Sequence, residues 1–459
     1  MKLTLIGGGG VRAPLFALST LKRADQIHLD ELCLMDIDAP KLAIIGQLCQ
    51  VIARRMGSDV RITITTDPRT AISGADYVVT SIRVGGDEGR VLDERVALRH
   101  GVLGQETTGP GGFAMALRSI PAILEYARLI DELAPGAWMF NFTNPAGLVA
   151  QALHDAGFER AVGICDGANL AQHAVATWMQ VPMSAVRTEV YGLNHLSWAR
   201  RAWINGDNVL PKLLQSDAFI NATELRVFEP ALVRAFGEWL NEYLFYYYYA
   251  ERAVASIQHD ERTRGEEIVA INAKLLADLA AIDIDQEPER ALKIYHAANA
   301  RRSATYMHYA RTDALDMERA DEQDYGSVDI GDEGEGYAGV ALDIIEAFES
   351  QEPVHIALNV PNAGAIACMR PDDVVEVSCI VDRHGIHPLP VGAVPESQEL
   401  LMRTVKHYER LTVEAIRTHS RDTAVMALMA HPLVMSYSRA RTLVDEYLQA
   451  HAPYVGDWH

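Results

Sequence analysis

Gly8 and Gly10 belong to a run of four glycines whose backbone could approach the phosphates of a dinucleotide. With Ala13 they fit the spacing G-x-G-x-x-A, in which the small third residue lets a helix pack on the preceding strand. The N–H groups that open this helix, at Val11 and Arg12, would then face the phosphates. Four consecutive glycines are also typical of a mobile turn that binds nothing, so the motif alone leaves both interpretations open.

Asp36 is the second residue that points to a cofactor. It follows the apolar run 32–35, and an acidic residue at the end of the second strand of such a unit binds the ribose 2′-hydroxyl, which favours NAD over NADP. Taken alone, an ordinary aspartate in a strand-to-helix loop is an equally good interpretation. Together, the glycine run and Asp36 predict a dinucleotide-binding unit.

Further polar side chains follow predicted strands later in the chain. Ligands of open α/β sheets bind beyond the carboxyl ends of the strands, so we expect the following residues to meet: Asn144, Cys165, Asp166, Asn194 and His195. A thiol and an imidazole can bind a borderline divalent metal. The spacing of Cys165 and His195 matches no compact zinc signature, and from spacing alone an inert buried thiol and a structural histidine are favoured.

Two other stretches have less specific chemistry. Residues 227–250 are rich in aromatic side chains, which pack in cores and subunit interfaces by default, so any single tyrosine there has a low prior of being catalytic. Residues 259–264 form a charged turn, which is more often exposed to solvent than functional.

The elements around these residues alternate between strand and helix. Apolar runs predict strands at 2–6, 32–35, 61–65, 76–80, 137–141 and 160–164. Such alternation is typical of a parallel, doubly wound sheet. We therefore expect an α/β fold with an N-terminal Rossmann-like NAD-binding domain at 1–160 and an α+β catalytic domain at 161–459. In the second domain we expect strands at 189–195 and 372–381, a loop at 313–337 and helices at about 397–450.

The composition of the 459 residues excludes several classes of function. With 41 Lys and Arg against 62 Asp and Glu, the net charge is −21, which argues against binding to nucleic acids or to anionic membranes. The sequence has no apolar run of the roughly 20 residues that a membrane span requires and no signal-peptide pattern. Its five scattered cysteines imply no disulfide framework. We expect a cytoplasmic enzyme.

Several motifs in order along the chain resemble glycoside hydrolase family 4, the NAD- and divalent-metal-dependent glycosidases. The resemblance extends essentially from end to end and is specific because the motifs are long and collinear. They are the glycine run with Pro14, the stretches 83–86 and 90–94, the stretch 104–112 (Gly-Gln-Glu-Thr-Thr-Gly-Pro-Gly-Gly), the stretch 141–146 (Asn-Phe-Thr-Asn-Pro-Ala) and the stretch 192–195 (Gly-Leu-Asn-His).

The resemblance implies roles for individual residues. Cys165 and His195 fall on the metal-ligand positions, which manganese usually fills, and Asp166 falls on the general acid of the branch that resembles 6-phospho-α-glucosidases. Tyr243 best matches the catalytic base, with Tyr246 or Tyr247 as alternatives. The remaining implied positions bind substrate (Arg90, Asn144, Asn194 and Arg264) or NAD (Gly8, Gly10, Val11, Arg12, Asp36 and Asn144).

The family's reaction, which the resemblance carries to this chain, is an oxidation-assisted elimination. NAD⁺ takes the C3 hydride, Tyr243 removes the C2 proton, Asp166 protonates the leaving oxygen, water adds, and the hydride returns. The metal would act as a Lewis acid on O2 and O3. A tyrosine can serve as base only where a cation favours the phenolate, so the metal and base assignments depend on each other.

The substrate expected from this resemblance is a glycoside with an anionic group at C6, most simply a 6-phospho-α-glucoside. Relatives usually carry a short proline-containing segment after the cysteine, whereas this chain has Gly-Ala-Asn at 167–169, so a C6-sulfonated glycoside (sulfoquinovoside) is the competing substrate. Other hypotheses are a simple NAD-dependent dehydrogenase, since the fold resembles the lactate and malate dehydrogenases, and a catalytically silent NAD-binding regulator. As in most relatives, a homodimer or homotetramer is expected.

Overall fold

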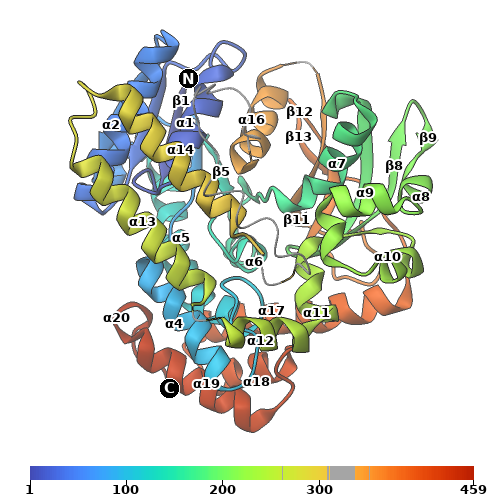
Figure 1. The fold of residues 1–459 in the computed structure, drawn as a ribbon. Helices are drawn as coiled ribbons and strands as arrows, with labels where there is room; N and C mark the ends of the chain where they lie inside the picture. The colour runs from blue at the N-terminus through green and yellow to red at the C-terminus, as the bar shows by residue number, and fades with distance from the viewer. Residues whose placement is uncertain (261, 308–309, 311–335, 351) are drawn as a thin grey trace.

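The computed structural model describes every residue except 261, 308–309, 311–335 and 351 (Figure 1). Within the described residues, 13 strands form one mixed sheet. Its first six strands are parallel and lie in the order β3-β2-β1-β4-β5-β6, as the alternation of strands and helices predicts. Their bounds are β1 (Lys2–Ile6), β2 (Glu31–Met35), β3 (Arg61–Thr65), β4 (Tyr77–Thr80), β5 (Trp138–Asn141) and β6 (Ala161–Gly163).

The other half of the sheet is antiparallel and continues directly from β6. The order there is β6-β11-β12-β7-β8-β10, with β13 paired to β12 and β9 paired to β8. The bounds are β7 (Val186–Leu193), β8 (Leu196–Ile204), β9 (Asp207–Asn208), β10 (Trp239–Leu240), β11 (Val354–Pro361), β12 (Val374–Asp382) and β13 (Gly385–Pro388). The expected division at 160/161 falls just before β6 and stays a prediction.

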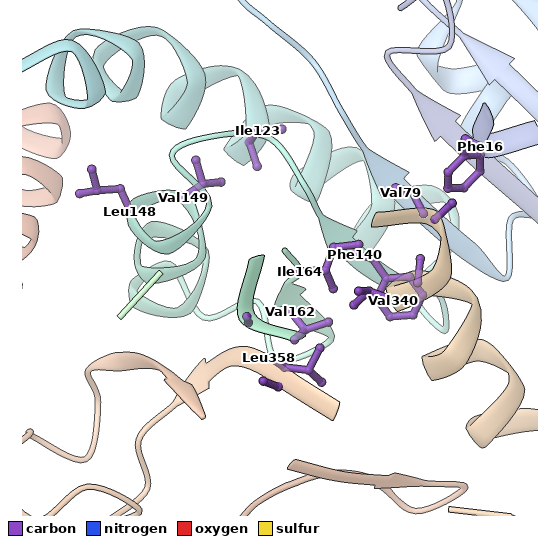
Figure 2. Close-up of a cluster of buried hydrophobic side chains, with 14 of the residues drawn as sticks. Phe16, Val79, Ile123, Phe140, Leu148, Val149, Val162, Ile164, Val340 and Leu358 are labelled. Atoms are coloured by element: carbon purple, nitrogen blue, oxygen red, sulfur yellow. The ribbon is translucent and has the colours of Figure 1, made fainter. Parts of the chain in front are cut away.

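Helices cover both faces of the sheet, and their packing sets the core. Figure 2 shows Val340 of α16 beside Phe140 on one side of the parallel strands, while Ile123 of α5 and Val149 of α6 lie on the other. The helices of the N-terminal half are α1 (Ala13–Lys22), α2 (Ala39–Met56), α3 (Pro68–Ile72), α4 (Gly86–Arg99), α5 (Gly109–Leu133), α6 (Ala146–Asp155) and α7 (Leu170–Met179). No helix of the described residues is both long and apolar enough to cross a membrane.

The C-terminal half adds further helices around the antiparallel strands. They are α8 (Leu210–Leu213), α9 (Asp217–Ala222), α10 (Pro230–Phe236), α11 (Phe245–Tyr248), α12 (Ala250–His259), α13 (Arg264–Ala280), α14 (Pro288–Ala304), α16 (Gly336–Glu349), α17 (Glu396–Thr418), α18 (Arg421–Ala430), α19 (Tyr437–Ala450) and α20 (Ala452–Val455). The helices expected from about 397 to 450 are confirmed. Most of the loop expected at 313–337 lies outside the described residues, and Gly336 already begins α16.

The turn between β1 and α1 can only be built from glycine at two positions. Gly7 has φ 99°, and a Cβ there would lie 2.2 Å from the carbonyl oxygen of Ser81. A Cβ on Gly8 would lie 2.7 Å from the Cβ of Leu34, because the turn packs directly over β2. The fold itself therefore requires glycine here, before any ligand is considered.

The strand expected at 189–195 is found as β7, which ends at Leu193 and runs antiparallel to both β8 and β12. Asn194 and His195 form the two-residue turn of the β7–β8 hairpin, since Leu193 pairs with Leu196. A short tight turn joins antiparallel strands directly, without the crossover helix that parallel strands need.

Candidate active site

Cys165 and His195 meet at the centre of the site although 30 positions separate them. The Cys165 Sγ lies 3.5 Å from the His195 Nε2, and the other ring nitrogen, Nδ1, lies 3.1 Å from the Thr107 hydroxyl. Cys165 follows β6 and His195 sits in the β7–β8 hairpin, while Thr107 belongs to the stretch before α5. Thr107 thus fixes the imidazole so that its free nitrogen faces the thiol.

The backbone at His195 adopts an unfavourable conformation in the turn that brings its side chain to Cys165. Its φ is 61°, in the left-handed region, where a two-residue hairpin normally has glycine or asparagine. A histidine there costs conformational energy, and such strain typically persists where the side chain has a function. The neighbouring Asn194 is directed inward, where its amide donates to the Glu376 carboxylate at 3.1 Å.

The pair fits two ligands of one divalent metal. Donor atoms at about 2.1 and 2.3 Å from a metal lie roughly 3.1–3.6 Å apart at angles near 90–110°, which includes the observed separation. Burial lowers the pKa of His195 to about 4, so the imidazole is neutral and able to bind a metal. Burial also raises the pKa of the Cys165 thiol, and the charges of Asp166 and Glu376 raise it further.

The described residues contain no group of three or more His, Cys, Asp or Glu side chains arranged to hold a metal ion. The chain therefore offers this site two strong donors. Remaining coordination positions would fall to oxygen atoms of a substrate or of water, as in open catalytic metal sites.

Tyr243 stacks directly on the His195 ring. The ring centroids are 3.8 Å apart with an interplanar angle of 12°. Tyr243 lies in the 3₁₀ turn η4 (Glu242–Leu244), which Asn241 fixes: its Oδ1 accepts from the Tyr243 amide at 3.0 Å, and its Nδ2 donates to the Gly167 carbonyl at 3.3 Å. One asparagine thus ties the tyrosine to the segment that carries Cys165.

The alternative tyrosines occupy different surroundings. Tyr246 packs edge-on against Tyr243 at 5.7 Å, and Tyr247 stacks over His431 at 6.1 Å. Tyr243 is thus the tyrosine whose ring stacks on His195. Burial raises the pKa of the Tyr243 phenol, and the charge of Glu242 raises it further, so the phenolate needs an added cation nearby.

Asp166 is the partly exposed neighbour of Cys165. Its Oδ1 is 3.8 Å from the Cys165 Sγ, its Oδ2 is 3.8 Å from an Arg12 guanidinium nitrogen, and its side chain is 42% exposed. Arg12 also lies over the Phe142 ring at 5.6 Å. Arg12 therefore joins the glycine turn to the metal pocket. Asn144 follows β5 in the neighbouring loop, where its Oδ1 accepts from the Ala146 amide at 3.4 Å.

The expected cofactor residues gather at the carboxyl ends of β1 and β2. Both carboxylate oxygens of Asp36 accept backbone hydrogen bonds at 3.0 Å, from Gly9 and from Asp38. Helix α1 begins without a side-chain cap or an acidic residue in its first turn. The Val11 amide makes no hydrogen bond with the described residues. An uncompensated helix N-terminus with an available amide fits the phosphates of NAD.

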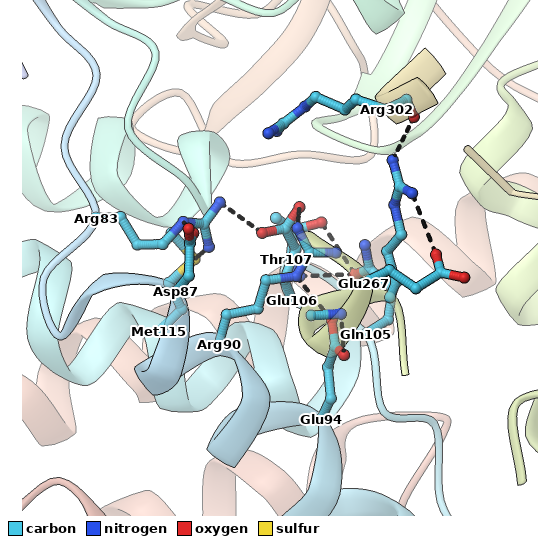
Figure 3. A network of polar contacts seen from close by, with 12 residues as sticks. Arg83, Asp87, Arg90, Glu94, Gln105, Glu106, Thr107, Met115, Glu267 and Arg302 are labelled. Carbon is cyan, nitrogen blue, oxygen red and sulfur yellow. Dashed lines mark hydrogen bonds and ion pairs between the residues drawn. The ribbon is translucent and has the colours of Figure 1, made fainter. Parts of the chain in front are cut away.

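A cluster of alternating charges lies beside Thr107, the hydrogen-bond partner of His195 (Figure 3). We call Arg83, Arg90, Glu94, Glu106, Arg264 and Arg302 the arginine cluster. Arg90 pairs with Glu94 at 2.8 Å and with Glu106 at 3.1 Å, and Glu106 pairs with Arg83 at 2.6 Å. Burial opposes ionisation of Glu106, but the charges of Arg83, Arg90 and Arg302 outweigh it and lower its pKa to about 2.

Arg264 enters the cluster from the first turn of α13. The Gly265 amide donates to Glu94 at 2.7 Å, so the carboxylate that holds Arg90 also holds the start of this helix. The Arg264 guanidinium donates to the Arg302 carbonyl at 2.7 Å and pairs with Glu267 at 3.3 Å. The charged stretch 259–264 is therefore not simply an exposed turn, because its last residue is largely buried.

Arg302 was not among the residues singled out in the sequence. Figure 3 shows its guanidinium directed toward the side of the cluster where Arg83 and Glu106 meet, and it makes no hydrogen bond or ion pair with any described residue. Burial and the charges of Arg12 and Arg90 lower the pKa of Arg302 to about 9. The only sequence signal was the basic pair Arg301-Arg302, which is ordinary at a helix C-terminus.

Comparisons with known proteins match almost the whole chain. A family model described as Family 4 glycosyl hydrolase matches residues 2–181, and one described as Family 4 glycosyl hydrolase C-terminal domain matches residues 190–434. The probable 6-phospho-beta-glucosidase of Bacillus subtilis is 31% identical, with 99% of this chain and 97% of that protein covered. The 6-phospho-alpha-glucosidase 1 of Lacticaseibacillus paracasei is 28% identical, with 98% and 97% covered.

Solved structures agree with these matches. The 6-phospho-beta glucosidase of Thermotoga maritima with manganese, NAD⁺ and glucose-6-phosphate has a TM-score of 0.81 at 26% identity, with 99% of both chains covered. A 6-phospho-alpha-glucosidase from gut microorganisms in complex with NAD and glucose-6-phosphate has a TM-score of 0.80 at 25% identity, with 100% and 99% covered. The cofactor prediction is thus confirmed in similar proteins.

A malate dehydrogenase of Salinibacter ruber matches more distantly. Its TM-score is 0.51 at 13% identity, with 91% of this chain and 99% of that chain covered. At this identity the likeness concerns the fold alone, and it confirms the expected dehydrogenase-like architecture.

Proposed function

This chain belongs to the family 4 glycosyl hydrolases, and we propose that it is a 6-phospho-α-glucosidase that works with NAD and a divalent metal. The relatives include both 6-phospho-α- and 6-phospho-β-glucosidases, and two solved relatives hold glucose-6-phosphate with NAD. The 6-phosphorylated sugar and NAD are therefore common to both kinds of relative, and the α-anomer is the finer part of the proposal.

The observation that carries the proposal is the unpaired guanidinium of Arg302 inside the arginine cluster. Arg90 and Arg264 have carboxylate partners, whereas Arg302 makes no ion pair with the described residues and lies in the positive field of Arg12 and Arg90. A dianion brought into this field would restore the pKa of Arg302 toward its ordinary value. A sugar 6-phosphate supplies such charge, with oxygens suited to the guanidinium fork.

The anomeric preference rests on Asp166. As the residue directly after Cys165, it matches the general acid of the α-branch, and its side chain is partly exposed. At this partly exposed position a carboxylic acid would protonate the oxygen of the leaving group. The Arg12 guanidinium at 3.8 Å would orient it.

Cys165 and His195 would hold the metal, and the turn at 7–12 with Asp36 would hold NAD. When bound, NAD takes up and returns a hydride at C3 of the sugar, and the metal acts as a Lewis acid on the sugar hydroxyls and favours ionised neighbours. Tyr243 then takes the proton from C2 through its phenolate oxygen. Asp166 delivers a proton to the glycosidic oxygen as the bond from C1 breaks, and water subsequently adds at C1.

A substrate panel tests this proposal. Nitrophenyl α- and β-glucosides, each unmodified, 6-phosphorylated or 6-sulfonated, are incubated with NAD⁺ and Mn²⁺. We expect hydrolysis of the 6-phospho-α-glucoside without net formation of NADH. Preference for the sulfonate would make the protein a sulfoquinovosidase, accumulation of NADH would make it a dehydrogenase, and equal hydrolysis of neutral and phosphorylated substrates would contradict the anion site.

Arg302→Met sharpens the test, with Arg301→Met as its matched control on the exposed side of α14. Losing one charge-assisted contact costs about 1.5–3 kcal/mol, which is roughly 10- to 150-fold in kcat/KM. We expect this loss for the 6-phospho substrate in Arg302→Met only. An equal loss in both variants, or none, removes Arg302 from the substrate site.

Cytoplasmic location, the homo-oligomeric state and the division into 1–160 and 161–459 stay predictions. Gel filtration with light scattering tests the oligomeric state.

A further inference from the structure

Arg118 of α5 is a buried arginine outside the arginine cluster. Its guanidinium donates to both carboxylate oxygens of Asp93, at 2.8 and 2.7 Å, and both side chains are at most 1% exposed. It also donates to two backbone carbonyls, that of Val84 at 3.0 Å and that of Ala114 at 2.9 Å. One side chain thus connects α5 with α4 and with the stretch that precedes α4.

The groups that Arg118 holds on this side adjoin two members of the arginine cluster. Val84 directly follows Arg83 in the chain. Asp93 lies about one helical turn after Arg90 on α4. Arg83 and Arg90 both pair with Glu106, and Figure 3 shows both side chains directed toward it. The positions of the Val84 carbonyl and of Asp93 therefore decide where these two arginine side chains begin.

The start of α4 packs so closely on the guanidinium that a side chain there would be crowded. A Cβ on Gly89 would lie 3.3 Å from the Arg118 Nη2, and a Cβ on Gly85 would lie 3.3 Å from its Nε. Gly85 also has φ 86°, a conformation that favours glycine. A shift of the Arg118 guanidinium would consequently be transmitted to the first turn of α4.

The C-terminal helices hold Asp93 from another side. The His451 Nε2 lies 2.7 Å from the Asp93 Oδ1, and the Tyr447 hydroxyl donates to the Asp93 carbonyl at 3.0 Å. Both of these side chains are at most 1% exposed. Tyr447 belongs to α19, and His451 directly follows that helix. A segment near the end of the chain is thus fixed to the residue that Arg118 also holds.

Stability alone is a weak reason for such a network. A buried ion pair contributes little net free energy of folding, because the loss of hydration offsets the attraction of the charges. A guanidinium that binds a carboxylate with two parallel hydrogen bonds does fix distance and direction. The network therefore suits the alignment of neighbouring groups better than it suits stabilisation.

We propose that Arg118 is a positioning residue for binding of the 6-phosphate of the substrate. Its bond to the Val84 carbonyl places Arg83, and its ion pair with Asp93 places Arg90. The inference rests on the proposed function, because that function places the phosphate at the arginine cluster. The phosphate is remote from the carbons that react, so its contacts are the same in the bound substrate and in the transition state. Misplaced arginines should therefore raise KM and change kcat little.

Arg118→Lys tests this role with the positive charge retained. A lysine ammonium can still neutralise Asp93, but it lacks the fork that binds two carboxylate oxygens and the Val84 carbonyl together. With 4-nitrophenyl 6-phospho-α-glucoside, NAD⁺ and Mn²⁺, we expect KM to rise about tenfold, as for one weakened charge-assisted contact, and kcat to stay within about twofold. Titration calorimetry with glucose 6-phosphate and NAD⁺ should show the same loss of affinity, whereas Mn²⁺ affinity should not change.

His451→Phe tests the contact of Asp93 with the C-terminal helices and leaves Arg118 in place. It removes one hydrogen bond, so KM should rise about threefold. His451→Gln should restore the KM of the unmodified protein, because its amide can still donate to Asp93. The matched control is Arg410→Lys, which makes the same change in the ion pair that Arg410 of α17 forms with Asp373, at 2.6 Å from its Nε. It should leave KM and glucose 6-phosphate affinity unchanged.

The outcomes separate positioning from a purely structural role. If Arg118→Lys lowers the temperature of unfolding but keeps the KM of the unmodified protein, or if KM rises equally in Arg410→Lys, the inference is wrong. Should Arg118→Lys fail to fold, the two His451 variants decide, and an unchanged KM in His451→Phe would overturn it.

The same measurements distinguish failure of the proposed function. If the unmodified protein binds glucose 6-phosphate but hydrolyses no 6-phosphoglucoside, the proposed function fails, while the affinities of the variants for glucose 6-phosphate still test the positioning role. If the unmodified protein does not bind glucose 6-phosphate, both are wrong.

Discussion

The electrostatics of the arginine cluster, called the charged wall below, is opposite to that of Cys165, His195 and Tyr243, called the neutral wall. In the arginine cluster the paired charges outweigh burial at Glu106, which Arg83 and Arg90 hold ionised. In the pocket around Cys165, His195 and Tyr243, burial favours the neutral form of all three groups. The charged wall therefore favours binding of an anion, whereas the neutral wall favours binding of a cation. A glycoside with a charged C6 group and a metal-bound hydroxyl pair would satisfy both at once.

The strongest test of the neutral wall is the loss of the Tyr243 hydroxyl. Tyr243→Phe keeps the ring on His195 but removes the base, and we expect kcat to fall by about 10²- to 10⁴-fold. Deuterium uptake at C2 during turnover in D₂O should fall in parallel. Hydride return at C3 would still come from the cofactor, so C3 should carry no solvent deuterium.

Tyr247→Phe is the matched control for this prediction, because Tyr247 packs on His431 instead. It should keep most of the activity. Full activity in Tyr243→Phe with continued labelling at C2 would move the base elsewhere, and Tyr246, edge-on to Tyr243, would be examined next.

The second prediction concerns the affinity of Cys165 and His195 for a divalent metal. Thr107 is the hydrogen-bond partner of His195 Nδ1, and losing a partner of this kind typically costs 10- to 100-fold in metal affinity, so we expect about that in Thr107→Val. Thr107→Ser keeps the hydroxyl and should bind Mn²⁺ like the unmodified protein. Titration calorimetry with Mn²⁺ measures this without turnover. Equal affinities in all three proteins would make the contact incidental to the metal.

The sequence could predict the parallel half of the site because topology alone brings its residues together. The carboxyl ends of β1, β2, β5 and β6 share one edge, so the glycine turn, Asp36, Asn144 and Cys165 were expected there, and the resemblance to family 4 added their roles. The antiparallel half follows no such rule. His195 reaches Cys165 through a strained hairpin.

Other parts of the site depend on contacts that no local pattern encodes. Asn241 positions Tyr243 by bonding to Gly167, which lies 74 positions earlier. Arg302 enters from the end of α14, where a basic pair resembles any helix terminus. Such residues become visible only when distant elements pack, because their roles come from burial and from the charges around them.

The third prediction tests the charged wall through pH. The pKa of Glu106 is about 2 in the folded protein, against about 4.3 for an unperturbed glutamate. Because the folded value is depressed, the stabilisation is complete above the unfolded pKa and is lost as the pH falls toward 2. We expect Glu106 to account for on the order of 1–3 kcal/mol of the acid-dependent loss in the free energy of unfolding.

Urea unfolding at a series of pH values measures this slope. Glu106→Gln should be less stable at neutral pH, because Arg83 and Arg90 lose a partner, and its stability should depend less on acid. Glu251→Gln, at an exposed position in α12, should keep the slope of the unmodified protein. An unchanged slope in Glu106→Gln would mean that the cluster does not hold this carboxylate ionised.

The smallest effect expected concerns the N-terminus of α13, which carries Arg264 into the charged wall. Thr263 and Glu266 form a capping box: the Thr263 hydroxyl accepts from the Glu266 amide at 3.3 Å, and the Glu266 carboxylate accepts from the Thr263 amide at 2.9 Å. Thr263→Ala removes the cap and should cost about 0.5–2 kcal/mol of unfolding free energy, while Thr263→Ser should retain it.

Since a frayed first turn also displaces Arg264, KM for the 6-phospho substrate should rise by a few-fold in Thr263→Ala. The neutral wall holds no part of α13, so Mn²⁺ affinity should not change. A fall in Mn²⁺ affinity equal to the rise in KM would show that the two walls are coupled, and the separation between an anion wall and a cation wall would then have to be abandoned.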